Sequence, residues 1–405
     1  RHPLLPFSRP LRWRSESVTW LEGDGLPGDT AIEQPRRAAA GLVALLPGPE
    51  PVLPGMEPAS GPPPGGLTRP FAALVGRRMT ATAANVEVTL VSGRLRSVSG
   101  EAQVQRLVLR GPLAESLDLA AQLARDIPLL PAASSFAEAA RAVAEGRVPR
   151  PRRTAAPSLA DVATLQDGFG AAVGHLLDVL LAETPRCRLE AGPRGVHQSR
   201  VALRRLRSVV RLFRPVFDGP RLRAWDRALG ACARDLGAAR DWDVFLDGVG
   251  RALAEAFPED RRIAALLDGA RGARAQAYSG LATTLAGPAF RALIWEGVAL
   301  ASAPPLAAPV PDKPTPAPDD ALPPFAARVM RKRWKRVRAA GDVMESLSAE
   351  ALHEMRLDVK RLRYAAELFA PLFGGGHARK LLKRLATLQD ALGLANDAAV
   401  ARGLV

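Results

Sequence analysis

An internal repeat constrains the fold of this 405-residue chain more than any other feature of its sequence. The segment HQSRVALRRLR, which begins at His197, matches the segment HEMRLDVKRLR, which begins at His353, at an offset of 156 residues. Without a gap, the same offset pairs nine identical residues among the 21 positions from 197 to 217. Recurrence at a fixed spacing is typical of a duplicated structural unit. We therefore predict two copies of one helical unit that pack as pseudo-symmetric halves.

Both copies lie in a region, residues 158–405, whose apolar residues recur three and four positions apart, as in amphipathic helices. A Pro-rich linker, 303–324, has nine prolines between positions 304 and 324 and is incompatible with regular structure. It divides the region into halves 158–302 and 325–405. Within the first half the pattern predicts helices at Leu159–Glu183, Val196–Phe213, Arg221–Leu236, Asp241–Ala256 and Arg262–Ala286.

Residues 1–150 have a different texture and predict a separate α+β domain. The first 70 or so residues are rich in Pro and Gly and predict an irregular segment of strands or loops. Alternating residues predict strands at 85–91, with a turn at Ser92-Gly93, and at 104–110. A helix is expected from Leu113 to Ile127, ending before Pro128. The basic segment 147–157 predicts the domain boundary.

The ends of the chain give two further expectations. Helical pattern in the first copy continues to about residue 302, whereas the second copy reaches only Val405, so we expect its last helices to be missing. The chain also begins at Arg1 without an initiator Met, so we expect its true N-terminus to lie upstream.

Composition limits the classes of protein. Two isolated cysteines, Cys187 and Cys232, exclude a disulfide framework and a cysteine-rich metal site. No apolar run approaches the ~18–20 residues of a membrane span, so the predicted location is the cytoplasm. Lys and Arg number 56 against 41 Asp and Glu, which gives a net charge of +15 and predicts an anionic partner.

The repeated segment carries a basic stripe. His197, Arg200, Arg204, Arg207, Arg211 and Arg214 are three or four residues apart and fall along one side of a helix. The opposite side carries Leu203, Leu206, Val210 and Phe213. Because this stretch contains no acid to neutralise it, it is expected to bind an anion; the alternative is a solvated face that pairs with carboxylates elsewhere.

The second copy repeats the stripe as His353, Arg356, Lys360 and Arg363, with Glu367 in place of Arg211. Guanidinium groups match phosphate oxygens in bidentate geometry, and two basic helices side by side would favour a linear polyanion. Basic residues are also dense at 328–338 and 379–384. The predicted phosphate-binding residues are His197, Arg200, Arg204, Arg205, Arg207, Arg211, Arg331, Arg333, His353, Arg356, Lys360, Arg361, Arg363, Lys380 and Lys383. No catalytic residue or metal ligand is predicted, since no nucleophile or carboxylate recurs with the histidines.

At these residues the chain resembles the CHAD domain, the conserved histidine α-helical domain. The resemblance covers residues 159–405 and rests on the motif His-x-x-Arg-x-x-x-(Arg/Lys)-Arg-Leu-Arg and a downstream Leu-Gly-x-x-(Arg/Asn)-Asp, both present twice. It implies two helical bundles around a basic groove that binds inorganic polyphosphate, often on polyphosphate granules. By motif position it carries that role to His197, Arg200, Arg204, Arg205 and Arg207, and to His353, Arg356, Lys360, Arg361 and Arg363.

The N-terminal region resembles the C-terminal part of a CYTH domain, the β-tunnel fold of triphosphatases and adenylate cyclases. That family holds metal and triphosphate with alternating glutamates and a Glu-x-Glu-x-Lys run, which this chain lacks. Val104, Arg106 and Val108 occupy the strand positions where glutamates are expected, and Glu87 alone lies in a comparable strand. The resemblance therefore implies a degenerate, non-catalytic CYTH-like domain.

Together these patterns predict a binding protein for inorganic polyphosphate or another linear phosphate polyanion, with no cofactor and no membrane partner. One alternative is a CYTH-type inorganic triphosphatase dependent on Mg²⁺ or Mn²⁺, with the helical region supplying affinity for the substrate. A second is nonspecific nucleic-acid binding, which the net charge alone allows. Aromatic residues make up only 5% of the chain, and no helix-turn-helix or stacking platform is evident, so single-strand recognition is not favoured. No sequence-specific nucleic-acid partner is expected.

Overall fold

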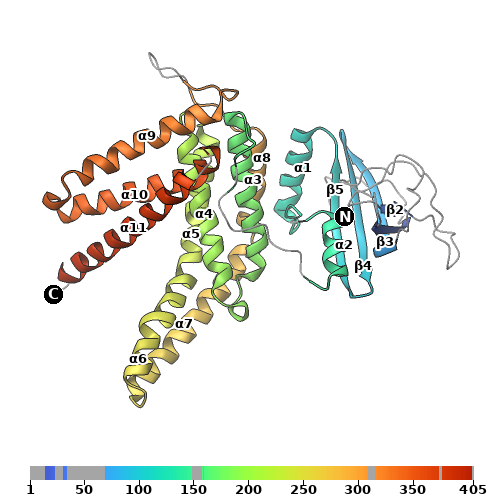
Figure 1. The fold of residues 1–405 in the computed structure, drawn as a ribbon. Coiled ribbons are helices and arrows are strands. Elements are labelled where there is room, and N and C mark those ends of the chain that lie inside the picture. Colours follow the sequence, from blue (N-terminus) through green and yellow to red (C-terminus); the bar gives the residue numbers. More distant parts are fainter. Residues whose placement is uncertain are drawn as a thin grey trace. The chain divides into compact units, whose positions relative to one another are not determined.

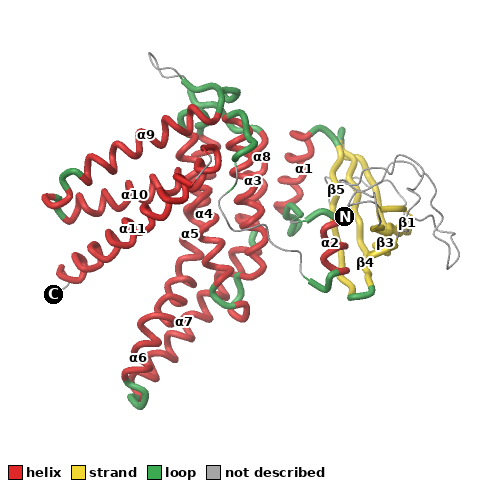
Figure 2. Tube along the Cα trace, in the orientation of Figure 1, coloured by secondary structure: helices red, strands yellow, loops and turns green. Residues whose placement is uncertain are grey.

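The structure is a computed structural model that describes residues 14–22, 31–33, 69–132, 134–147, 157, 159–308, 315–373 and 376–403 (Figures 1 and 2). The chain divides into two compact units, Arg1–Pro151 and Arg152–Val405. Most of residues 1–70 and part of the Pro-rich linker lie outside the described residues. The described parts of 1–70 all lie in strands, which agrees with the expected strands or loops, although these parts are regular rather than irregular.

The first unit contains an antiparallel sheet with strand order β2-β1-β3-β4-β5. Apolar residues of alternating parity point to its two faces. Val91 and Val104 pack against the second helix, whereas Val88 packs against Leu123 of the first. The elements are β1 (Arg14–Glu22), β2 (Ala31–Glu33), β3 (Arg69–Ala83), β4 (Val86–Ser97), β5 (Gly100–Arg110), α1 (Leu113–Asp126) and α2 (Phe136–Ala144).

The predicted turn at Ser92-Gly93 is wrong, because β4 continues through these residues to Ser97. Gly93 pairs with Gly76 of β3, and a Cβ atom on Gly93 would lie 2.6 Å from the carbonyl oxygen of Val75. This glycine therefore permits close approach of two strands. The expected strand at 104–110 and the helix that ends before Pro128 are confirmed.

The second unit is helical. Its elements are α3 (Leu165–Glu183), η1 (Thr184–Arg186), η2 (Leu189–Ala191), α4 (Arg194–Phe213), α5 (Pro220–Phe245), the π-helical turn η3 (Leu246–Gly250), α6 (Arg251–Ala256), α7 (Arg261–Ala286), α8 (Pro288–Ser302), α9 (Leu322–Gly341), η4 (Met344–Ser346), α10 (Ala349–Phe369), η5 (Ala370–Phe373) and α11 (Gly376–Gly403). Among the described residues, no helix combines the length and apolarity needed to span a bilayer.

Each copy of the repeat forms three consecutive helices. The first copy forms α3, α4 and α5, and the second forms α9, α10 and α11 at closely corresponding positions. In Figure 1, α9 and α11 lie on either side of α10. The three-dimensional pseudo-symmetry of the halves stays a prediction.

Aromatic side chains join the two copies at their repeated helices. Phe213 of α4 and Phe369 of α10 occupy equivalent positions in the repeat, and their ring centroids are 6.1 Å apart. Phe325 of α9 stacks on Phe213 at 5.5 Å and meets Phe369 edge-on. All three rings are buried. Residues that are identical in the two copies, Phe213 and Phe369, therefore pack together in one core that the copies share.

The predicted break between Leu236 and Asp241 is wrong, because α5 runs without interruption from Pro220 to Phe245. Gly237 lies within the helix, and a Cβ atom there would be 3.0 Å from Nη1 of Arg200. Glycine at this position leaves space for a guanidinium group from α4. Interhelix packing thus outweighs the weak helix propensity of glycine.

Substitution of Gly297 in α8 tests the packing of the second unit. A Cβ atom at Gly297 would lie 2.7 Å from the Trp225 ring and 3.0 Å from Leu177. We expect Gly297→Ala to destabilise the fold by about 1–3 kcal/mol through overpacking. Gly280→Ala in α7, where nothing lies within 4 Å, should instead stabilise it by about 0.5–1 kcal/mol. Urea denaturation followed by circular dichroism checks both values; equal effects would contradict the packing.

Candidate anion-binding site

The basic stripe lies on α4, which packs between α3, α5 and α10. Leu203, Leu206, Val210 and Phe213 are buried, so the predicted apolar side of this helix is confirmed. His197, Arg204 and Arg211 are exposed, whereas Arg200 and Arg207 are half-buried. The helix therefore presents its cations at a junction with two neighbouring helices.

Two cations of the stripe are held by α5. Arg200 donates from Nη1 to the carbonyl oxygen of Ala233 at 2.8 Å. Arg207 donates from Nε to Asp226 at 2.9 Å. Gly230 and Gly237 leave room for the two guanidinium groups, because a Cβ atom at either would come within about 3.2 Å of them. Arg207 is neutralised by a carboxylate, but Arg200 keeps its full charge.

His197 stands at the head of the stripe among other cations. The residue is exposed overall, but neighbouring side chains partly desolvate its ring, which lowers its pKa most. The charges of Arg240, Arg204 and Arg200 lower the pKa further. Each of these arginines disfavours the protonated imidazole. At neutral pH the ring is therefore expected to be uncharged, with one N–H available as a donor.

The stripe of the second copy meets that of the first. Burial lowers the pKa of Lys360, and the charges of Arg356 and Arg204 lower it further. Arg204 belongs to α4 and Lys360 to α10, so the charge effect places cations of the two repeats near each other. The guanidinium of Arg204 also lies 5.8 Å from the ring centroid of Tyr364 on α10.

These contacts define one group of side chains drawn from α4, α5 and α10. We name it the basic cluster, and it consists of His197, Arg200, Arg204, Arg240, Arg356 and Lys360. Nε of Arg356 is buried and has no hydrogen-bond partner among the described residues. A buried donor without an acceptor costs about 1–3 kcal/mol. An oxyanion that enters the cluster would supply both the missing acceptor and the missing negative charge.

Other predicted site residues are engaged in contacts between helices. Arg205 pairs with Glu367 at 3.1 Å, and Arg363 donates to the same carboxylate at 3.0 Å. Arg361 pairs with Asp358 at 2.7 Å, and Arg333 of α9 donates to the carbonyl oxygen of Arg361 at 2.9 Å. Glu367, which replaces a basic residue in the second stripe, therefore ties α4 to α10.

The remaining predicted residues lie on exposed surface. His353 is exposed near the start of α10, and the others are Arg211, Arg331, Lys380 and Lys383. Among the described residues, no hydrogen bond or ion pair joins these last four to the basic cluster. The structure therefore separates the predicted set into cluster members, interhelix partners and surface cations.

Arg240 was missed by the sequence analysis. It lies on α5 within the segment Leu236-Gly237-Ala-Ala-Arg240, which is part of the recurring downstream motif. The recurring motif contains Arg240 and could have identified it. The predicted break in α5, however, placed this residue between two helices. In a continuous helix, Arg240 is one turn beyond Gly237 and therefore close to the guanidinium of Arg200.

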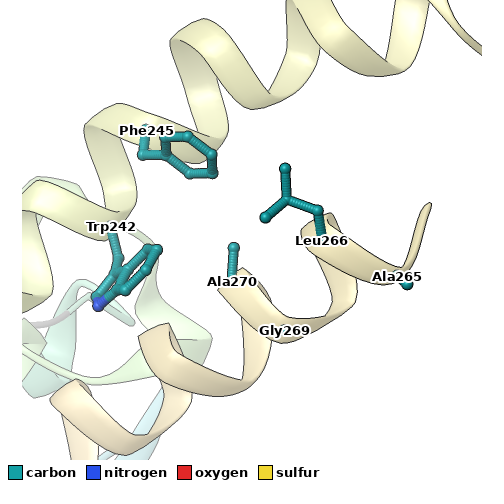
Figure 3. Close-up of a pocket in the computed structure, with 6 residues that line it drawn as sticks. All are labelled: Trp242, Phe245, Ala265, Leu266, Gly269 and Ala270. Carbon is teal, nitrogen blue, oxygen red and sulfur yellow. The ribbon is translucent and has the colours of Figure 1, made fainter. Parts of the chain in front are cut away.

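An apolar hollow of about 510 Å³ lies apart from these cations, between the end of α5 and α7. Figure 3 shows Trp242 and Phe245 of α5 facing Leu266 and Ala270 of α7. Its lining carries no charged side chain. It therefore contributes nothing to anion binding.

Comparison with known proteins agrees with the motifs. A family model described as "CHAD domain" matches residues 171–405. The chain belongs to the CHAD family. That match includes both copies of the repeated motif and every member of the basic cluster.

Two solved structures similar to this CHAD protein are the CHAD domain from the plant Ricinus communis and PptA from Streptomyces chartreusis. The first is 28% identical, with alignment over 63% of this chain and 82% of that chain and a TM-score of 0.43. The second is 18% identical, over 60% of this chain and 85% of that chain, with a TM-score of 0.43. No curated protein matches the chain.

The lowered pKa of His197 predicts a pH effect on the stability of this CHAD protein. When the folded-state pKa of a base lies below its unfolded value, the unfolded chain binds more protons between the two values. Stability therefore falls as the pH drops below about 6.5. Wild type and His197→Gln are compared by urea midpoints between about pH 5 and 8, and the variant should lose less stability on acidification. Equal losses would contradict the charge environment of His197.

Glu367 gives a second test. Glu367→Ala leaves the half-buried Arg205 and Arg363 without their shared carboxylate. We expect destabilisation by about 1–3 kcal/mol. Asp268→Ala, which removes an exposed pair with Arg271 on α7, should cost under about 1 kcal/mol. Denaturant unfolding measures both variants, and an equal cost would show that Glu367 does not tie the repeats together.

Proposed function

We propose that this CHAD protein binds inorganic polyphosphate at the basic cluster, without catalysing a reaction on it. The observation that carries the proposal is the position of Arg204 of α4, whose guanidinium carbon lies 5.8 Å from the ring centroid of Tyr364 on α10, since it brings a cation of the first repeat to the helix that carries Arg356 and Lys360. The buried Nε of Arg356 has no hydrogen-bond acceptor among the described residues, so it can donate to a phosphate oxygen. Such an arrangement is stable when a polyanion neutralises it.

The side chains have complementary parts in binding. Arg204 and Arg356 offer guanidinium forks for bidentate contact with phosphate oxygens, whereas Lys360 supplies a point charge. His197 donates an N–H, and a bound phosphate would favour its protonated form. Release of counterions from the polymer contributes to the affinity, so binding is expected to weaken as salt rises.

We also propose that the N-terminal unit is a CYTH-like domain that does not hydrolyse triphosphate. Val104 and Val108, which stand where that family would have glutamates, are buried against α2. Arg106 lies over the Phe136 ring at 4.3 Å. This face is filled by apolar packing and a cation, which supports binding in the helical unit alone.

The proposed location of the protein is the cytoplasm, on polyphosphate granules where these form. The proposed symmetry of the helical unit is that of two pseudo-equivalent halves.

The experiment compares long-chain polyphosphate binding by wild type and by the double variant Arg204→Glu/Lys360→Glu. Reversal of two charges at the centre of the cluster should weaken binding at least about tenfold, because one or more charge-assisted contacts become repulsive. Isothermal titration calorimetry at low and near-physiological salt measures the affinity. Circular dichroism verifies that each variant keeps its helical fold.

The matched control is Arg251→Glu/Arg271→Glu, which changes the net charge by the same amount on α6 and α7. These arginines are exposed and lie outside the cluster. The control should bind polyphosphate within about threefold of wild type, since distant exposed charges are screened. Equal losses of affinity in the two double variants would show that binding depends only on net charge and not on the basic cluster. Unchanged affinity in the cluster variant would reject the cluster as the binding site.

A further inference from the structure

Helix α9 has a second, separate concentration of positive charge. It contains no Asp or Glu between Leu322 and Gly341. Its exposed cations form what we name the α9 basic face, which consists of Arg328, Arg331, Lys332, Lys335, Arg336 and Arg338. From the first to the last of these residues the helix extends about 15 Å.

Several exposed arginines elsewhere in the helical unit pair with nearby carboxylates. Arg262 pairs with Asp260 at 2.8 Å, Arg221 with Glu296, and Arg223 with Asp218 at 2.7 Å. In the part of the chain that the structure describes, no ion pair involves a member of the α9 basic face. Six exposed cations without an ion pair among the described residues are therefore concentrated along this one helix, and that concentration favours an external anion.

The α9 basic face is distinct from the basic cluster. The opposite side of α9 packs on α10, where Val337 and Met330 join the core around Met355. Arg333 is turned toward the same helix and donates to the carbonyl oxygen of Arg361. The cluster member Lys360, in contrast, approaches α4. Helix α10 thus separates the two groups of cations.

Trp334 distinguishes the chemistry of this face. Its side chain is flanked in sequence by Arg333 and Lys335, and the residue is 47% exposed although it is the largest apolar type. Exposed aromatic rings among cations are typical of surfaces that stack on unpaired bases while the cations hold phosphates. Inorganic polyphosphate has no ring that could cover the indole. A ligand that uses the whole face must therefore offer both phosphates and flat apolar groups.

We propose that the α9 basic face binds single-stranded nucleic acid without sequence preference, with Trp334 stacking on a base. The sequence pattern predicted no stacking platform for a single strand, whereas the exposed ring of Trp334 supplies one. The expectation of no sequence-specific nucleic-acid partner is unaffected, since stacking and phosphate contacts read no sequence. This inference does not depend on polyphosphate binding at the basic cluster, because the two sites share no residue.

The test uses fluorescence anisotropy of the full chain with a short labelled oligo(dT). Lys332→Glu/Lys335→Glu should weaken binding at least about tenfold, because phosphate contacts supply most of the affinity. It should leave polyphosphate affinity unchanged within about threefold. Arg204→Glu/Lys360→Glu changes the net charge equally and is the matched control, which should lose polyphosphate and keep oligo(dT). A result in which both double variants lose both ligands equally would overturn the proposal.

Trp334→Leu isolates the stacking contribution. It should weaken oligo(dT) binding about fivefold or more, and it should not change binding of an abasic oligonucleotide of the same length. The leucine preserves helix propensity, and circular dichroism verifies the fold. Equal affinity of wild type and Trp334→Leu for oligo(dT) would reject nucleic acid as the ligand. Selective loss of anionic vesicle binding in Lys332→Glu/Lys335→Glu would assign the face to a membrane surface instead.

Discussion

The contact between α4 and α10 is the constraint on which the rest of the helical unit depends. It brings equivalent segments of the two repeats together, with Phe213 and Phe369 in one buried core. Next to that core, Glu367 binds Arg205 from one copy and Arg363 from the other. Apolar burial supplies the attraction and the shared carboxylate offsets part of the charge. These contacts together oppose the electrostatic repulsion between the two basic stripes.

That repulsion explains why some cations of the stripes are paired with carboxylates and others are not. Arg207 is neutralised by Asp226, and Arg361 by Asp358. Arg204, Arg356 and Lys360 remain together; burial lowers the pKa of Lys360 most, and the charges of the two arginines lower it further. The fold thus spends part of its stability on keeping a few charges close together, as is common at binding sites. A ligand that neutralises them recovers this free energy on binding.

Sequence patterns predicted much of this architecture for physical reasons. Helical periodicity located α4 within two residues, because burial of Leu203, Leu206 and Val210 depends only on local spacing. The same reasoning failed where glycine had a role in packing. Gly93 was expected in a turn and Gly237 at a helix end, but both allow close approach of neighbouring groups. The presence of a glycine in a sequence does not reveal whether its backbone freedom serves a turn or its missing side chain makes room for a neighbouring group.

The sequence by itself determined the repeat, the apolar and basic sides of α4, the CHAD motifs and the excess of positive charge. Only the tertiary structure decided which cations are free to meet a ligand, because pairing depends on neighbours distant along the chain. Arg205 and Arg204 are adjacent in sequence, yet one faces Glu367 and the other approaches Lys360. Exposure of Trp334 was likewise decided by packing, since α9 buries only the side that meets its neighbours. Residue type and spacing fix what each side chain can do, and the fold determines which groups surround it.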